Sequence, residues 1–170
     1  MIKFKFLLLL GSILLISCDS KKGYSDLDKL YADFVVYLKD TNTENLKNYC
    51  YEITPDQETI DYMKKNNFSY RGIPEELEKN KIEPSYIGDK YYEYVLAFKE
   101  QLISNNRLNN LKYIGRERKG EELYNEKLKI YVTETFILLE SDGDTIRCKL
   151  GEMFKVNDKW KSFTSPKLGW

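Results

Sequence analysis

The sequence predicts a single α+β domain, with N-terminal helices packed on one face of a C-terminal, strongly twisted antiparallel sheet. Apolar residues recur at helical spacing between residues 25 and 103. Beyond Asn105 apolar and polar residues alternate, as they do along a half-buried strand. Short turn sequences separate the alternating segments, and consecutive strands joined by short turns pair antiparallel.

The first three helices are expected to begin at capping residues. Ser25 forms a capping box with Asp28 and opens an amphipathic helix that extends to residue 39. A second, shorter helix is expected from Thr43. Thr54 is expected to cap the third helix, with Pro55 at its first helical position.

The longest helix is expected over residues 85–103. The segment before it, residues 72–84, has a polar and irregular composition, and one helical turn is expected there, at residues 74–79. The apolar stripe of the long helix consists of Ile87, Tyr91, Tyr94, Val95, Phe98 and Leu102. Such a stripe predicts a helix that packs on the sheet.

The strands are expected to form a meander. The predicted strands are residues 111–118, 128–139, 145–156 and 159–165. Turn residues join them at Gly120, at residues 141–144 and at Asn157 with Asp158. The second and third strands therefore form a long hairpin.

The candidate pocket residues are Glu134 and Glu152, because each is the single carboxylate on an otherwise apolar face of the long hairpin. A three-residue loop at residues 142–144 would bring the two apolar faces to one side and the two carboxylates directly opposite each other, with Cβ atoms about 5 Å apart. Two carboxylates in an apolar hollow raise the pKa of one of them, which would make an acid–base pair or a cation site.

A structural role for the two carboxylates is the alternative. Gly151 would then mark a β-bulge that turns Glu152 to solvent. Glu134 would pair with Arg147, Lys149 or a tyrosine hydroxyl.

Cys50 and Cys148 allow two interpretations. A disulfide between them would close a long loop and stabilise the fold by roughly 4–5 kcal/mol. Alternatively, the two residues are small buried side chains that do not meet. The sequence contains no distance between them, so both interpretations stay open.

Composition excludes several kinds of chemistry. The chain contains no histidine, and its 27 basic residues balance its 27 acidic residues. Without imidazole, Ser-His-Asp and Cys-His catalysis and most zinc sites are excluded. Without a strong field of either sign, nucleic acid is not an expected partner. We expect no metal and no cofactor, and we assign no catalytic residue.

Residues 1–17 have the layout of a secretory signal peptide. Lys3 and Lys5 precede an uncharged apolar run that is shorter than the roughly 20 residues needed to cross a bilayer. The run ends at Leu15-Ile16-Ser17-Cys18, which resembles the lipobox of bacterial lipoprotein precursors. The alternatives are an uncleaved membrane segment, or a secreted protein that is cut elsewhere.

The lipobox resemblance implies cleavage before Cys18, a diacylglyceryl group on its sulfur and a further acyl chain, such as palmitate, on its new amino group. Two or more acyl chains hold a protein stably on a membrane. Residues 18–23 would then be the lipidated cysteine and its tether, and residues 24–170 the domain. The protein would lie on the extracytoplasmic side of the cell membrane, either inner or outer.

The order of elements also resembles the nuclear-transport-factor-two-like (cystatin-like) superfamily. The resemblance rests on the opening helix at residues 25–39, the long hairpin at residues 128–156 and the closing sequence Val156-Asn157-Asp158-Lys159-Trp160-Lys161. It implies a cone-like domain with a ligand-binding hollow between the helices and the sheet.

These observations favour a non-catalytic, membrane-anchored domain that binds a protein partner or a small ligand. One alternative is a small isomerase or dehydratase, with Glu134 or Glu152 as the base and a tyrosine as the proton donor. A second alternative is an immunity-type lipoprotein that inhibits a toxin.

Overall fold

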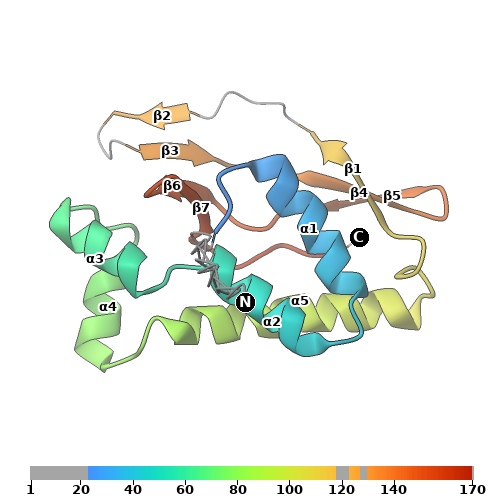
Figure 1. Cartoon of the computed structure of the whole chain (residues 1–170), viewed down its shortest axis with the longest axis horizontal. Coiled ribbons are helices and arrows are strands. Elements are labelled where there is room, and N and C mark those ends of the chain that lie inside the picture. The colour runs from blue at the N-terminus through green and yellow to red at the C-terminus, as the bar shows by residue number, and fades with distance from the viewer. Residues whose placement is uncertain (1–22, 118–122, 127–129, 170) are drawn as a thin grey trace, which may run out of the picture.

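The protein has the predicted α+β class, with helices and two antiparallel sheets (Figure 1). The computed structural model describes residues 23–117, 123–126 and 130–169. The expected signal peptide, the lipidation site at Cys18 and the turn at Gly120 lie outside the described residues. The strands lie along one side of the molecule and the longest helix runs along the other (Figure 1).

The helices lie close to their predicted positions. They are α1 (Leu27–Lys39), α2 (Thr43–Ile53), α3 (Gln57–Lys65), α4 (Ile73–Asn80) and α5 (Ser85–Ser104). The segment before α5 therefore contains a helix of 8 residues where one turn was expected. Gly72 precedes α4 in the left-handed conformation, and Pro74 occupies its first turn, which together favour a helix start there.

Two of the predicted caps are wrong. The carboxylate of Asp26, not the Ser25 hydroxyl, accepts the hydrogen bond from the Lys29 backbone N–H at the start of α1. At the start of α3 the cap is Asp56, because the Thr54 hydroxyl donates to the Cys50 carbonyl at the end of α2. In both places an acidic side chain meets the positive end of the helix, where a negative charge is stabilised.

The strands are shorter and more numerous than predicted. They are β1 (Lys112–Arg116), β2 (Leu123–Asn125), β3 (Ile130–Thr133), β4 (Ile137–Ser141), β5 (Asp144–Cys148), β6 (Met153–Val156) and β7 (Lys159–Ser162). One sheet has the order β1-β4-β5 and the other the order β2-β3-β6-β7. The prediction of two uninterrupted hairpin strands is wrong, because the chain breaks after Thr133 and after Cys148 and passes between the sheets.

The turn between β4 and β5 has two residues, not three. Ser141 pairs with Asp144, so Asp142 and Gly143 form the turn. Both have positive φ, 55° and 84°, as two-residue hairpin turns of type I′ require. The buried apolar residues of β4 are consequently Ile137 and Leu139, with Ser141 also buried, where the sequence pattern predicted the even-numbered set.

The register predicted for the whole hairpin occurs in β3 and β6, where Thr133 pairs with Met153. The extra residue between the sheets shifts the pairing by one and exchanges the faces of the strand.

The main core fills the space between the helices and the sheets. Leu30, Phe34, Phe98 and Trp160 are among its fully or nearly fully buried residues. On α5 the predicted stripe is buried at four positions, Tyr91, Val95, Phe98 and Leu102. Tyr94 is 53% exposed and does not belong to the core.

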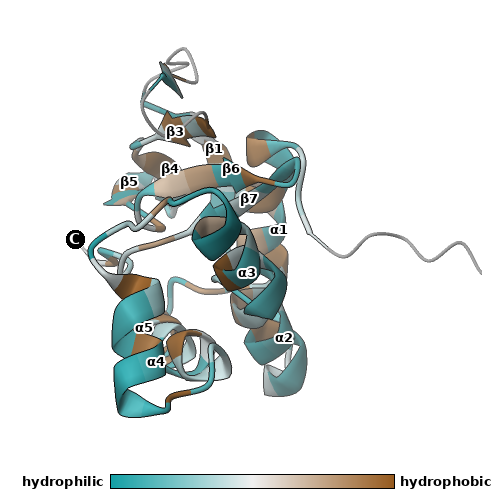
Figure 2. Cartoon of the chain, turned by 90° about the vertical axis from the view of Figure 1, so that its left-hand side faces the viewer, coloured by the Kyte–Doolittle hydropathy of each residue, from teal (hydrophilic) through white to brown (hydrophobic). Residues whose placement is uncertain are grey.

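A second apolar cluster covers the opposite face of the sheet β2-β3-β6-β7. Met153 belongs to the main core, whereas its neighbour Phe154 packs with Met63 and Phe68 of the α3 region. Adjacent residues of a strand point to opposite faces, so this sheet carries helices on both faces. Figure 2, viewed from the end at which α3 and α4 lie, shows α3 next to β6 and β7. The expectation of helices on one face only is therefore wrong for this sheet.

Gly151, which lies where the chain passes between the two sheets, has no room for a side chain. Its φ is +105°, and a Cβ atom there would lie 2.5 Å from the Thr164 carbonyl oxygen and against the Ser162 hydroxyl. We expect Gly151→Ala to lower the free energy of unfolding by at least about 2 kcal/mol in chemical denaturation followed by circular dichroism.

Gly72→Ala is the matched control for this variant. Its φ is +71° and a Cβ atom would meet nothing within 4 Å, so only the conformational cost of about 1 kcal/mol is expected. Equal losses for the two variants would show that Gly151 has no steric role.

Candidate binding site

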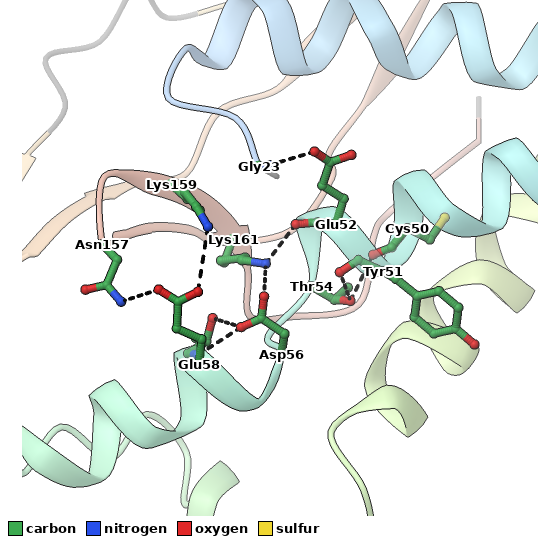
Figure 3. A network of polar contacts seen from close by, with 11 residues as sticks. Gly23, Cys50, Tyr51, Glu52, Thr54, Asp56, Glu58, Asn157, Lys159 and Lys161 are labelled. Atoms are coloured by element: carbon green, nitrogen blue, oxygen red, sulfur yellow. Dashed lines mark hydrogen bonds and ion pairs between the residues drawn. The ribbon is translucent and has the colours of Figure 1, made fainter. Parts of the chain in front are cut away.

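The candidate site lies where the end of α2 and the start of α3 meet β7. Trp160 of β7 points into the main core, so its neighbour Lys161 points to the other face, toward α3. Lys161 is only 3% exposed. Its ammonium donates to Asp56 Oδ2 over 2.8 Å and to the Glu52 carbonyl over 2.9 Å (Figure 3). A lysine from one end of the chain therefore joins α2 to α3.

Asp56 binds Lys161 and also caps α3. Its Oδ1 accepts hydrogen bonds from the Thr59 backbone N–H, over 2.9 Å, and from the Thr59 hydroxyl, over 2.7 Å. Burial alone would raise the pKa of Asp56. The hydrogen bond and charge of Lys161, with the two bonds from Thr59, outweigh burial and lower that pKa. The carboxylate is therefore ionised at neutral pH and compensates the buried ammonium.

Further polar contacts at the edge of the site join α3 to the turn before β7, and α2 to Gly23. Glu58 of α3 accepts from the Asn157 amide over 3.0 Å, and the Lys159 ammonium lies 3.7 Å from its other oxygen. The Gly23 backbone N–H donates to Glu52 Oε1 over 2.7 Å (Figure 3). The N-terminal chain thus enters the described domain directly beside the site.

Two hollows, each of about 430 Å³, border this junction and share Tyr51 and Asp56 in their linings. The first is lined by Asn48, Tyr51, Glu52, Asp56 and Lys161. The second is lined by Tyr51, Thr54, Pro55, Asp56, Gln57, Glu83, Pro84 and Ser85. Volumes of this size fall within the range of small-molecule sites. We call the first one the Lys161 hollow.

Tyr51, which lines both hollows, is fixed by α5. Its hydroxyl donates to Asp89 Oδ1 over 2.5 Å, and this bond, with burial, raises the pKa of Tyr51. Its ring lies so close to Gly88 that a Cβ atom on that residue would overlap the ring. The Lys47 ammonium lies 5.5 Å from the ring centroid. The tyrosine is therefore a preorganised part of the wall.

Glu134 directly follows β3 and Glu152 directly precedes β6, next to the pair of Thr133 with Met153, and each carboxylate has a partner of its own. The Glu134 carboxylate accepts from the Lys149 ammonium, and the Glu134 side chain is 59% exposed. Glu152 accepts from the Tyr70 hydroxyl and, over 3.2 Å, from Arg71. These contacts are of the kind that the structural alternative predicts, and a role as acid, base or cation ligand stays a prediction.

Cys50 and Cys148 are buried in the main core as free thiols. Burial raises the pKa of Cys50 to about 12. Burial, partly offset by a hydrogen bond from the Gly169 backbone, raises the pKa of Cys148 to about 11. Of the two interpretations left open by the sequence, small buried side chains describe this arrangement.

Sequence reasoning missed the Lys161 hollow. A lysine in a strand is expected to face solvent, and its carboxylate partner lies 105 residues away in the chain. One signal was available, because Asp56-x-x-Thr59 is a capping pattern that starts one turn after the end of α2. The pattern would have located Asp56 but not its partner.

Comparisons of the chain with protein-family models, with curated proteins and with solved structures found no match. Among the described helices, none combines the length and the apolar character that crossing a bilayer requires. Within the described ranges, no group of three or more Cys, Asp or Glu side chains is arranged to hold a metal ion.

Asp56→Asn is expected to destabilise the protein through Lys161. Asparagine caps helices as well as aspartate does, so the variant removes mainly the charge that compensates the ammonium. Because the Asp56 side chain is 46% exposed, screening limits the expected loss to about 1–2 kcal/mol at neutral pH. Chemical denaturation across a range of pH values measures it.

The pH dependence of that loss has a fixed sign. Folding lowers the pKa of Asp56, so its contribution is complete above the unfolded pKa of about 3.9 and disappears as the pH falls through the lower, folded value. Asp61→Asn, an equal charge change on an exposed part of α3, should cost less than about 0.5 kcal/mol. A difference that persists unchanged in acid would contradict the ion pair.

The two core thiols are expected to be unreactive in the native state. In a Cys18→Ala variant, Cys50 and Cys148 are the remaining cysteines of the three. We expect neither to react with Ellman's reagent at about pH 8, because both are buried and protonated, and both to react in denaturant without reductant. If no thiol reacted in denaturant until a reductant was added, the two cysteines would be joined.

Proposed function

We propose that the protein is a lipoprotein, anchored through an acylated Cys18 on the extracytoplasmic side of a bacterial membrane, and that its domain is a non-catalytic binding module. The sequence support is the charged start, the apolar run and the lipobox-like Leu15-Ile16-Ser17-Cys18. The structural support is the position of Gly23, because this residue bonds to a side chain that lines the Lys161 hollow.

Anchorage at Cys18 would keep this hollow close to the membrane. Cys18 precedes Gly23 by five residues, and five extended residues reach at most about 18 Å. The bond between the Gly23 N–H and Glu52 and the bond from the Trp160 N–H to the Tyr24 carbonyl, 2.7 Å, hold Gly23 and Tyr24 beside the hollow. The bound ligand would therefore be a component of the envelope or a molecule that reaches it.

A binding role, rather than chemistry, is proposed because the charges at the junction already compensate each other. The buried ammonium of Lys161 is held by Asp56, and the Asp56 carboxylate is shared with the cap of α3. Charged groups held in this way position the walls of a hollow and are not free to exchange protons with a substrate.

We further propose that the fold is a bent, cone-like relative of the nuclear-transport-factor-two-like superfamily. β3 leads into β4 and β5 leads toward β6, so one hairpin contributes to both sheets, which supports a bent sheet. The helices α3 and α4, which pack on the face of the sheet that carries Phe154, are an addition to the layout expected of that superfamily.

Expression of the full chain in a bacterium tests the anchor. We expect the wild-type protein to partition into the detergent phase, and mass spectrometry to find an N-terminal Cys18 that carries diacylglyceryl and acyl groups. Cys18→Ala should remain an uncleaved and unacylated precursor, whereas Cys50→Ala, a buried cysteine, should be acylated normally. An unmodified Cys18 or an intact leader in the wild-type protein would contradict the proposal.

A further inference from the structure

We propose that the Lys161 hollow binds a neutral, polyhydroxylated ring, that is, a sugar residue of an envelope glycan. This inference deepens the proposed binding function and rests on it. The walls of the hollow still offer hydrogen-bonding groups once their internal contacts are counted.

The floor of the hollow offers a donor. A lysine ammonium has three N–H donors, and two of those of Lys161 are taken by Asp56 and the Glu52 carbonyl. Among the described residues no third partner is present, so one N–H is available to an oxygen that enters the hollow. Because Lys161 is 97% buried from solvent in a rigid position, this donor is preorganised.

The wall formed by α2 offers acceptors and a further donor. Asn48 and Glu52 are four residues apart on α2, and side chains at this spacing lie on one face of a helix. One carboxylate oxygen of Glu52 accepts from Gly23, which leaves the second oxygen available among the described contacts. The Asn48 amide contributes both an acceptor and donors, and it is exposed at the rim.

This combination selects hydroxyl groups over charged groups. A phosphate or carboxylate in the hollow would meet Glu52 and Asp56, and an ammonium group has no acceptor for the Lys161 N–H. A hydroxyl both donates and accepts, so vicinal hydroxyls can bond to Glu52 or Asn48 on one side and to Lys161 on the other. Charge-assisted bonds of this kind are stronger than neutral ones.

The shape and the place of the hollow fit the same ligand. Its volume of about 430 Å³ suits a ring of this size, and Tyr51 supplies an aromatic wall that the apolar C–H groups of a sugar can contact. The hollow lies beside Gly23, where the chain from Cys18 enters the domain, so a glycan at the envelope is within reach of an anchored protein.

Nuclear magnetic resonance titration tests the proposal on the acylated protein in non-ionic detergent. The probes are methyl glucoside and methyl N-acetylglucosaminide, with cyclohexylmethanol as a ring of similar size that has one hydroxyl. We expect the two glycosides to shift the backbone amides of Asn48, Tyr51, Glu52 and Lys161, and cyclohexylmethanol to shift them much less.

Two variants connect the binding to the walls. Asn48→Ala and Glu52→Gln should each weaken glycoside binding about fivefold, the equivalent of one hydrogen bond of about 1 kcal/mol. Glu52→Gln keeps an oxygen for the Gly23 N–H, so the fold should be preserved. Glu44→Gln, an equal charge change on α2 away from the hollow, should leave the affinity unchanged.

Each remaining outcome overturns the sugar proposal. Equal shifts from cyclohexylmethanol would make the hollow merely apolar, and larger shifts from phosphoethanolamine or from a lysine-containing peptide would assign it to a charged ligand. Absence of glycoside shifts at this hollow would remove it as a sugar site. None of these results bears on acylation of Cys18, so failure here is distinguishable from failure of the proposed anchorage.

Discussion

The arrangement of the elements around the site depends on one buried cation, the ammonium of Lys161. Taking an uncompensated charge out of water costs several kcal/mol, so a buried lysine has to be met by an anion and by further acceptors. Asp56 provides the anion and the Glu52 carbonyl the second acceptor. Since Glu52 belongs to α2 and Asp56 starts α3, this requirement fixes both helices against β7.

The same constraint explains why the sheet β2-β3-β6-β7 is covered on both faces. Trp160 belongs to the main core, and Lys161, next to it on β7, must therefore lie on the other face. That face would be open to solvent without α3, whose residues Ile60 and Met63 pack on Phe154 and Val156. The Lys161 ammonium and the second apolar cluster thus share one face of the sheet, and α3 covers both.

The helices could be predicted from the sequence because their signal is local. The apolar spacing of Leu30, Phe34 and Leu38 places one face of α1 in the core without reference to any other element. The break between β3 and β4 could not be predicted in this way, because Phe136 and Leu138 continue the apolar alternation of Ile130 and Val132 across it. The change of face becomes visible only from the partners of each strand.

The turn between β4 and β5 shows how a nonlocal assumption can overrule a correct local signal. Asp142-Gly143 is a strong sequence signal for a two-residue turn, and the structure has that turn. A three-residue loop was predicted because it kept the apolar residues of an uninterrupted hairpin on one face. The assumption failed because the hairpin divides between two sheets, one on each side of residues 134–136.

The first described residue, Gly23, and the proposed ligand site share a side chain. Glu52 accepts the Gly23 N–H with one oxygen and lines the Lys161 hollow. A ligand that bonds to the same carboxylate orders a group that also holds the start of the domain. Ligand binding would favour the conformation in which the Glu52 carboxylate is ordered. The bond with the Gly23 N–H favours the same conformation. The bond between Gly23 and Glu52 and the occupation of the hollow are therefore expected to be coupled through one carboxylate, each strengthening the other by the same factor.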